Sequence, residues 1–195
     1  VQKYSNIEIL ENWEVKDLIG RNGEIQAIKA QSKNQKGEFF GRILVGADGV
    51  YSMVARKTIC PRRNFQHGAF GIRAYFQGVK DLTHRIEIHC DRASLPGYGW
   101  VFPTGENSAN VGFGITPRHL QEKNIRNLFQ TFVEGNPFVK ERLGEARMVE
   151  NSLQGGLIPS GSFFQRRSRK NVLLVGDAGG FTDILTGEGI LFALR

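Results

Sequence analysis

The chain has 195 residues, of which 40% are hydrophobic and 23% charged, a composition that fits an ordinary globular protein and excludes a disordered or low-complexity chain. The sequence holds no stretch near the ~18 apolar residues of a membrane-spanning helix and does not begin with the pattern of a signal peptide. These features predict a cytoplasmic protein.

The two cysteines, Cys60 and Cys90, lie far apart and outside any CxxC or Cys/His spacing, so we expect neither a disulfide framework nor a metal site. The formal net charge is +7, and a basic run occupies residues 166–170 (Arg-Arg-Ser-Arg-Lys). No aromatic residues alternate with it, so a solvated basic loop is favoured and no nucleic acid partner is expected.

The N-terminal third predicts a hairpin and then a longer strand. Residues 13–19 and 25–30 flank Asn22-Gly23, which supplies the positive φ angles of a tight hairpin turn. The next run, residues 39–47, is nearly continuously apolar and predicts one strand buried on both faces. A short helix is predicted at residues 51–57.

The middle of the chain shows the alternation of antiparallel strands. These strands are predicted at residues 69–79, 85–89, 99–102 and 109–115. Helical spacing of apolar residues between 124 and 143, broken at Gly135-Asn136-Pro137, predicts one amphipathic helix and a second, shorter one. Residues 171–175 predict a last strand. The fold class expected is therefore α/β (mixed α+β), a Rossmann-like layer interrupted by an antiparallel sheet.

The strongest chemical signal is the glycine-rich segment LLVGDAGGFTDILTGEGIL, residues 173–191. A carboxylate after a strand, followed by glycines and a helix, is how α/β proteins hold a phosphate-bearing cofactor. Asp177 can accept hydrogen bonds from a sugar hydroxyl, Gly187 and Gly189 allow close backbone approach, and a helix starting near Glu188 would direct N–H groups at an anion. A strand-to-helix turn with a capping Asp explains the spacing equally well.

This segment resembles the second FAD signature of the flavoenzymes related to p-hydroxybenzoate hydroxylase. The resemblance implies that Asp177 holds the ribitol of FAD and that the following helix start stabilises negative charge on the reduced flavin. The residues that it places at the cofactor are Gly176, Asp177, Ala178, Gly187, Glu188, Gly189 and Ile190.

A second segment, ILVGADGVYSMVAR from residue 43, resembles the Asp-Gly fingerprint of the same superfamily. The resemblance implies that Asp48 and Gly49 lie near the FAD pyrophosphate, with Arg56 on the following helix. Alone, a strand that ends in Gly-Ala-Asp-Gly is a common turn. The two motifs in this order predict that the two strand ends, with Asp48 and Asp177, converge on one cofactor.

A third segment, LPGYGWVFP at residues 95–103, resembles the Tyr-x-Trp-x-Phe-Pro substrate motif of geranylgeranyl reductases. The resemblance implies that Tyr98, Trp100, Phe102 and Pro103 contact the substrate. Strand geometry places the three aromatic rings on one face, where they could form an apolar wall for an isoprenoid chain. An aromatic strand that packs the core of a sheet is the alternative from spacing alone.

Together the resemblances imply an FAD-dependent oxidoreductase of the geranylgeranyl reductase family that reduces prenyl C=C bonds by flavin hydride transfer. They imply an isoprenoid or quinone-like substrate, NAD(P)H or ferredoxin as electron donor, and no catalytic side chain. A lipid substrate would bring the protein into peripheral contact with a membrane. The expected domains are an FAD-binding part at residues 1–60, a substrate-binding sheet at 61–160 and a second FAD-binding part at 161–195.

Two alternatives stay open. The protein could instead be an FAD-dependent monooxygenase of an aromatic or quinone substrate. The 195 residues could also be a non-catalytic fragment, because no GxGxxG unit precedes Asp48 and both ends look cut. In that case the chain alone would bind FAD weakly or not at all.

Overall fold

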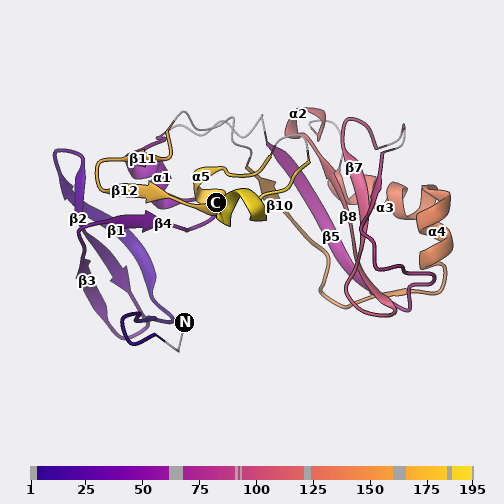
Figure 1. Cartoon of the computed structure of the whole chain (residues 1–195), viewed down its shortest axis with the longest axis horizontal. Helices are drawn as coiled ribbons and strands as arrows, with labels where there is room; N and C mark the ends of the chain where they lie inside the picture. The colour runs from indigo at the N-terminus through magenta and orange to yellow at the C-terminus, as the bar shows by residue number, and fades with distance from the viewer. Residues whose placement is uncertain are drawn as a thin grey trace. The chain divides into compact units, whose positions relative to one another are not determined.

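The computed structural model describes residues 4–61, 68–90, 92, 94–120, 124–159, 166–183 and 186–194. The strands form three sheets, and helices occur between the strands along the chain, which confirms the mixed α/β class (Figure 1). The chain divides into two compact units, Val1–Arg63 with Phe164–Gly179 and Asn64–Phe163 with Gly180–Arg195. The division cuts the glycine-rich segment after the last strand.

The first unit begins with the predicted hairpin. Strands β1 (Glu14–Arg21) and β2 (Glu24–Gln31) pair antiparallel, and β3 (Lys36–Phe40) adds to the free edge of β2. Asn22 and Gly23 adopt φ angles of 56° and 78°, as a tight turn between twisted strands requires. The hairpin prediction is confirmed.

The predicted single strand at residues 39–47 is wrong, because the run contributes to two different sheets. After β3 the chain leaves the hairpin sheet, and β4 (Leu44–Gly46) joins β12 (Val172–Leu174) and β11 (Ser168–Arg169) in the order β11-β12-β4. An apolar run predicts a strand but does not say which partner that strand will pair with.

The expectation that this run is buried on both faces is also wrong. Ile43 is 64% exposed and Val45 is 50% exposed. Only Gly46 at the end of β4 is buried, and a Cβ added there would lie 2.9 Å from side-chain atoms of Leu174 and Val54. Glycine at this position therefore allows β4, β12 and helix α1 (Met53–Thr58) to pack closely.

The second unit is built on an antiparallel sheet with the order β10-β5-β8-β7-β6. Its strands are β5 (Ala69–Gln77), β6 (Glu87–His89), β7 (Tyr98–Pro103), β8 (Ser108–Ile115), β9 (Arg147–Met148), which pairs with β5, and β10 (Gln154–Ile158). The four strands predicted between residues 69 and 115 are confirmed.

Helices cover one face of this sheet and form its core. These helices are α3 (Ile125–Gly135) and α4 (Pro137–Leu143). Two further short helices are α2 (Pro117–Leu120), which follows β8, and α6 (Ile190–Leu194), which has no buried residue. Val101 of β7 and Val111 and Phe113 of β8 form one buried cluster with side chains of the two helices, among them Phe132 of α3 and Val139 of α4. Because strand side chains alternate, Tyr98, Trp100 and Phe102 lie on the opposite face.

The predicted break between the two helices is confirmed at Asn136. Its backbone N–H bonds the Phe132 carbonyl at the end of α3, and its side-chain oxygen accepts from the N–H groups of Phe138 and Val139, both at 3.1 Å. Asn136 thus ends α3 and caps α4, which satisfies backbone groups that a helix end leaves unpaired.

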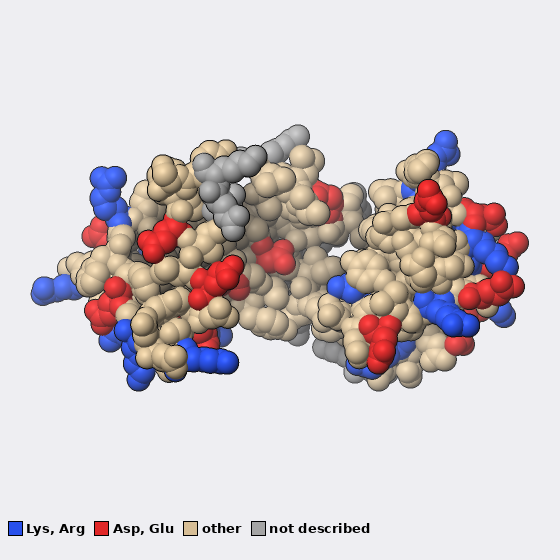
Figure 2. Space-filling model, turned by 90° about the horizontal axis from the view of Figure 1, so that it is seen from below, with Lys and Arg blue, Asp and Glu red and all other residues tan. Residues whose placement is uncertain are grey.

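The basic run at residues 166–170 is tied into the first unit through backbone carbonyls. Arg167 Nε donates to the Gly179 carbonyl at 3.1 Å, Arg169 Nη1 donates to the Thr58 carbonyl at 3.0 Å, and Lys170 Nζ donates to the Asn22 carbonyl. These cations therefore hold two helix ends and a hairpin turn in place. On the face shown in Figure 2, acidic and basic residues are intermingled.

No helix in the described residues is both long and apolar enough to cross a lipid bilayer.

Candidate functional site

The two strand ends that carry the predicted cofactor motifs lie side by side. Strands β4 and β12 pair in parallel with Leu44 opposite Val172 and Gly46 opposite Leu174. The pairing continues past the strands, because Val175 N–H donates to the Gly46 carbonyl at 3.0 Å. The predicted convergence of these two ends is confirmed, and their loops leave the same edge of one sheet, where α/β proteins place ligands.

Asp48 uses its carboxylate to cap helix α1. Its Oδ2 accepts hydrogen bonds from Met53 N–H at 2.7 Å and Val54 N–H at 3.1 Å, while Ser52 Oγ accepts from Ala55 N–H at 2.9 Å. Two side chains thus satisfy three N–H groups in the first turn of α1. This geometry makes Asp48 the residue that fixes the loop between β4 and α1.

Asp177 differs from Asp48 because its carboxylate has no hydrogen-bond or ion-pair partner among the described residues. It lies in the first turn of the short helix α5 (Gly176–Gly179), directly after β12. Although the residue is exposed, partial burial of the carboxyl raises its pKa above the ordinary value of 3.8. An unpaired, partly desolvated acceptor at a strand end is suited to bind hydroxyl or N–H donors of a ligand.

Glycines beside both aspartates keep the backbone accessible. Gly49 and Gly176 have φ angles of +72° and +54°, and a Cβ added to either would meet no atom within 4 Å. A ligand can therefore approach the main chain closely at both strand ends. This open backbone and the Asp177 carboxylate, which is unpaired among the described residues, fit a polar cofactor with a sugar and phosphates.

Two other predicted cofactor residues have different surroundings. The Ala178 side chain is fully buried, so it packs inside the first unit and only its backbone could reach a ligand. Arg56 is exposed in the last turn of α1, away from the N-terminal turn that Asp48 caps.

Three of the four predicted substrate residues form one aromatic surface, which we call the aromatic wall (Tyr98, Trp100 and Phe102). The Trp100 ring lies 5.9 Å from both neighbouring rings, tilted by 56° to Tyr98 and stacked at 27° on Phe102. Pro103 does not line the same pocket but a separate one with Leu82.

The aromatic wall lines a pocket of about 230 Å³. The other lining residues are Ala69, Pro96, Gly97, Gly114, Ile115, Thr116, Ile158 and Gly187. The lining is predominantly apolar, as expected of a site that holds a hydrocarbon group. The volume is below the ~300–1,000 Å³ typical of pockets that enclose a whole drug-sized ligand, so the pocket suits one section of a longer chain.

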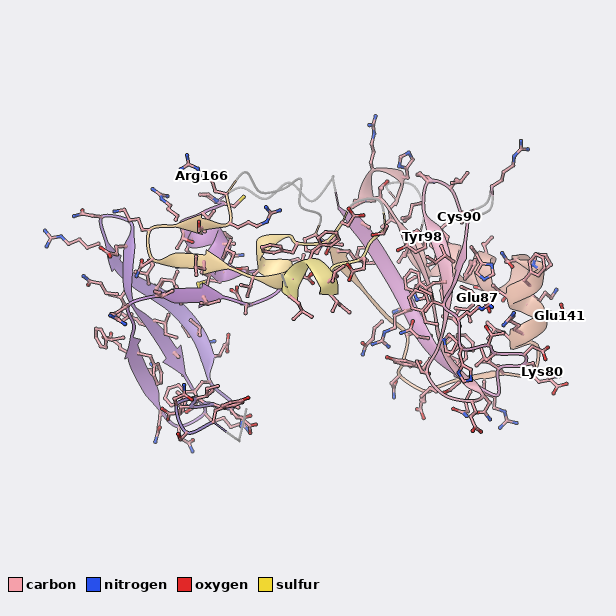
Figure 3. The ribbon with its side chains drawn as sticks, in the orientation of Figure 1. Lys80, Glu87, Cys90, Tyr98, Glu141 and Arg166 are labelled. Atoms are coloured by element: carbon pink, nitrogen blue, oxygen red, sulfur yellow. The ribbon has the colours of Figure 1, made fainter. Side chains whose placement is uncertain are left out.

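The TGEG stretch of the glycine-rich segment, residues 186–189, touches the aromatic wall. The Tyr98 hydroxyl donates to the Thr186 carbonyl at 2.7 Å, and a Cβ on Gly187 would lie only 2.6 Å from that hydroxyl oxygen. Burial raises the pKa of Tyr98 above 10.0, with a smaller effect from Cys90, so the hydroxyl stays a donor at neutral pH. Figure 3 shows Tyr98 on its strand in the second unit.

The remaining predicted residues surround the start of α6. Glu188 Oε1 accepts from Leu191 N–H at 2.8 Å, while its Oε2 is buried without a hydrogen-bond partner among the described residues. A Cβ on Gly189 would lie 2.9 Å from Thr182 Oγ1, so a larger residue here would have to displace that hydroxyl. Ile190 is 76% exposed.

Sequence reasoning missed the residues of β8 that lie beneath the aromatic wall. Trp100 Nε1–H donates to Asn110 Oδ1 at 2.9 Å, and Gly112 and Gly114 lie next to the indole. The alternation Asn110-x-Gly112-x-Gly114 places them on one strand face. The sequence alone shows this alternation, but only the strand pairing shows that this face of β8 lies against Trp100.

Comparison with known proteins identifies part of the second unit. Residues 72–154 match the model of the geranylgeranyl reductase catalytic domain. The digeranylgeranylglycerophospholipid reductase of Methanothrix thermoacetophila is 32% identical over 184 residues, which is 92% of this chain and 44% of that protein. The menaquinone reductase of Mycobacterium tuberculosis H37Rv is 32% identical over 163 residues, 79% of this chain and 38% of that protein. The chain spans less than half the length of these curated relatives.

Solved structures agree on the fold. A geranylgeranyl bacteriochlorophyll reductase-like protein from Thermoplasma acidophilum superposes with a TM-score of 0.77 at 21% identity, covering 93% of this chain and 45% of that one. The flavin-dependent brominase Bmp2 superposes with a TM-score of 0.75 at 18% identity, covering 93% and 47%. The fold is thus shared with several kinds of flavoprotein, whereas the sequence match is specific, and the chain belongs to the geranylgeranyl reductase family.

Proposed function

We propose that the protein containing this chain is an FAD-dependent oxidoreductase that reduces C=C bonds in the prenyl chain of a lipid or quinone. The observation that carries the proposal is the pocket in which the aromatic wall meets Gly187 of the glycine-rich segment. The family match supports the reaction type, and the names of the relatives, reductases of a digeranylgeranyl phospholipid and of menaquinone, support the substrate class.

In this proposal the first unit holds the pyrophosphate-to-ribitol part of FAD. The free Asp177 carboxylate accepts hydrogen bonds from ribitol hydroxyls, and the open backbone at Gly49 and Gly176 admits the pyrophosphate. Asp48 contributes by keeping the β4–α1 loop in shape. Further main-chain contacts would come from Ala178, and Arg56 would supply a positive charge on α1.

The second unit contributes the substrate side. Reduced FAD, when bound, would supply the hydride from the flavin N5, and a proton from solvent would complete the addition of H₂ to the double bond. Residues 186–189 would line the flavin, with Glu188, Gly189 and Ile190 at the α6 start, while the aromatic wall orients the prenyl chain and excludes water. Pro103 would lie beyond the pocket, toward the rest of a long chain. In this proposal the protein side chains position the flavin and the substrate, and none of them acts as a nucleophile or a metal ligand.

The test uses the full-length protein with chemically reduced FAD under anaerobic conditions and a geranylgeranyl lipid as substrate. Mass spectrometry should show stepwise gain of H₂, and Trp100→Leu should reduce the rate at least tenfold, because it removes the centre of the apolar wall. Trp13→Phe serves as the matched control, because it changes the other tryptophan, which belongs to the first unit. An intact prenyl chain with flavin-loaded wild-type protein would refute the proposal, and substrate-stimulated oxygen uptake with NAD(P)H would instead indicate a monooxygenase.

A further inference from the structure

The indole of Trp100 lies flat against the open face of the sheet because glycines leave room for it. A Cβ added to Gly112 would lie 2.1 Å from Trp100 Cζ2 and 2.3 Å from Cε2, which is inside the ring's own volume. A Cβ added to Gly114 would lie 3.5 Å from Trp100 Cζ3, and one added to Gly71 would lie 3.7 Å from Trp100 Cη2. Gly112 sits directly opposite Trp100 in the β7–β8 register. We call these three positions the glycine floor (Gly71, Gly112 and Gly114).

One polar contact fixes the ring on this floor. Asn110 Oδ1 accepts the Trp100 Nε1–H bond at 2.9 Å, and both residues are partly buried. Asn110 pairs with Phe102 across the β7–β8 register, so it lies at the other end of the aromatic wall from Tyr98. The indole N–H is donor-only and needs an acceptor when it is removed from water.

We propose that Asn110 is a positioning residue that holds Trp100 flat on the glycine floor and thereby sets the shape of the prenyl pocket. The inference rests on the proposed function for the identity of the ligand. Trp100 is stacked on Phe102 and tilted against Tyr98, so a rotated indole would disturb both neighbours and the pocket that all three line. Asn110 itself does not line the pocket and acts only through the ring.

The experiment reads Trp100 directly. The sequence has two tryptophans, so Trp13→Phe leaves Trp100 as the single tryptophan in the 195-residue chain. In that background, Asn110→Leu removes the acceptor at similar size, and Asn110→Asp keeps an oxygen acceptor. We expect Asn110→Leu to shift the emission to longer wavelength, speed the decay of anisotropy and weaken geranylgeraniol binding about fivefold or more, the equivalent of one lost hydrogen bond. Asn110→Asp should restore most of the emission and affinity.

A matched glycine pair tests the floor independently, in case Asn110→Leu fails to fold. Gly112→Ala places a methyl group where the indole lies, whereas a Cβ on Gly156 of β10 meets nothing within 4 Å. We expect Gly112→Ala to change the emission and affinity as Asn110→Leu does, and Gly156→Ala to match the background protein.

The outcomes separate the inference from the function on which it rests. Unchanged emission, anisotropy and affinity in Asn110→Leu would overturn the role of Asn110, even if the background protein binds geranylgeraniol. Failure of the background protein to bind geranylgeraniol would count against the proposed function. The ligand-free emission and anisotropy would then still decide whether Asn110 holds the ring.

Discussion

Two aspartates of the first unit should respond to pH in opposite directions. Burial raises the pKa of Asp177, so the folded state binds its proton more tightly than the unfolded state, and stability falls as pH rises through and above 3.8. The Lys57 hydrogen bond, with the Leu18 N–H, lowers the pKa of Asp17, so its contribution is present above 3.8 and is lost as pH falls through the lowered pKa.

We therefore expect Asp177→Asn to raise the free energy of unfolding slightly at pH 7, by less than about 1 kcal/mol because solvent screens the site. Asp17→Asn should lower it at the same pH. Both differences should shrink toward pH 3, as measured by urea denaturation across the pH range. If Asp177 binds the ribitol, Asp177→Asn in the full-length protein should also weaken FAD binding about tenfold. A variant that is less stable at pH 7 yet binds FAD normally would argue for a purely structural aspartate.

The Tyr98 hydroxyl offers a second test at single-residue resolution. Tyr98→Phe keeps the ring but removes the 2.7 Å hydrogen bond to the Thr186 carbonyl, which should cost about 0.5–1.5 kcal/mol. Amide hydrogen exchange should become faster at residues 186–189. Tyr75→Phe is the matched control, since no side-chain hydrogen bond of Tyr75 occurs among the described residues. Equal exchange in the two variants would contradict the link.

At the scale of elements, one side chain joins three segments of the first unit. Asn171 Nδ2 donates to the Ile25 carbonyl at 2.6 Å and the Arg42 carbonyl at 3.1 Å, and Oδ1 accepts from Ile25 N–H at 3.0 Å. It therefore ties β2 and the β3–β4 connection to the start of β12. Such a bridge compensates for a three-residue strand that has little pairing of its own.

Asn171→Ala should lower the free energy of unfolding by about 1–3 kcal/mol, since it leaves partly buried backbone groups unpaired. Asn171→Asp keeps the oxygen acceptor and loses only the donors. Hydrogen exchange at the Ile25 amide should therefore stay slow in Asn171→Asp and become fast in Asn171→Ala. Slow exchange in both variants would show that the Ile25 N–H is protected by another group.

Local patterns predicted most elements but not their partners. The Asn22-Gly23 turn and the alternation along residues 109–115 are set by neighbours in sequence, so the hairpin and β8 were predicted. Pairing depends on segments far away, so the split of residues 39–47 between two sheets was not. The same limit hid Asn110, whose role appears only when β7 and β8 are aligned. The aromatic wall was found because its motif lies on one strand.

At the scale of the whole molecule, cofactor affinity should depend on segments outside these 195 residues. The FAD residues proposed here cover the ribitol end and part of the pyrophosphate, and no GxGxxG unit is present in the sequence. We expect the isolated chain to bind FAD at least a hundredfold more weakly than the full-length protein, measured by flavin fluorescence quenching. A yellow purified chain with stoichiometric flavin would contradict this expectation.

The parallel pairing of β4 with β12 also constrains the order in which the parts of the protein fold. Leu44 pairs with Val172, so the ribosome must synthesise about 130 further residues before β4 meets its neighbour, and closing a loop of that size costs roughly 4 kcal/mol of chain entropy. The antiparallel sheet, whose strands mostly pair with near neighbours, can form during that delay. On the nascent chain, the sheet edge that carries Asp48 and Asp177 would thus be among the last parts to assemble, after the strands around the aromatic wall have formed.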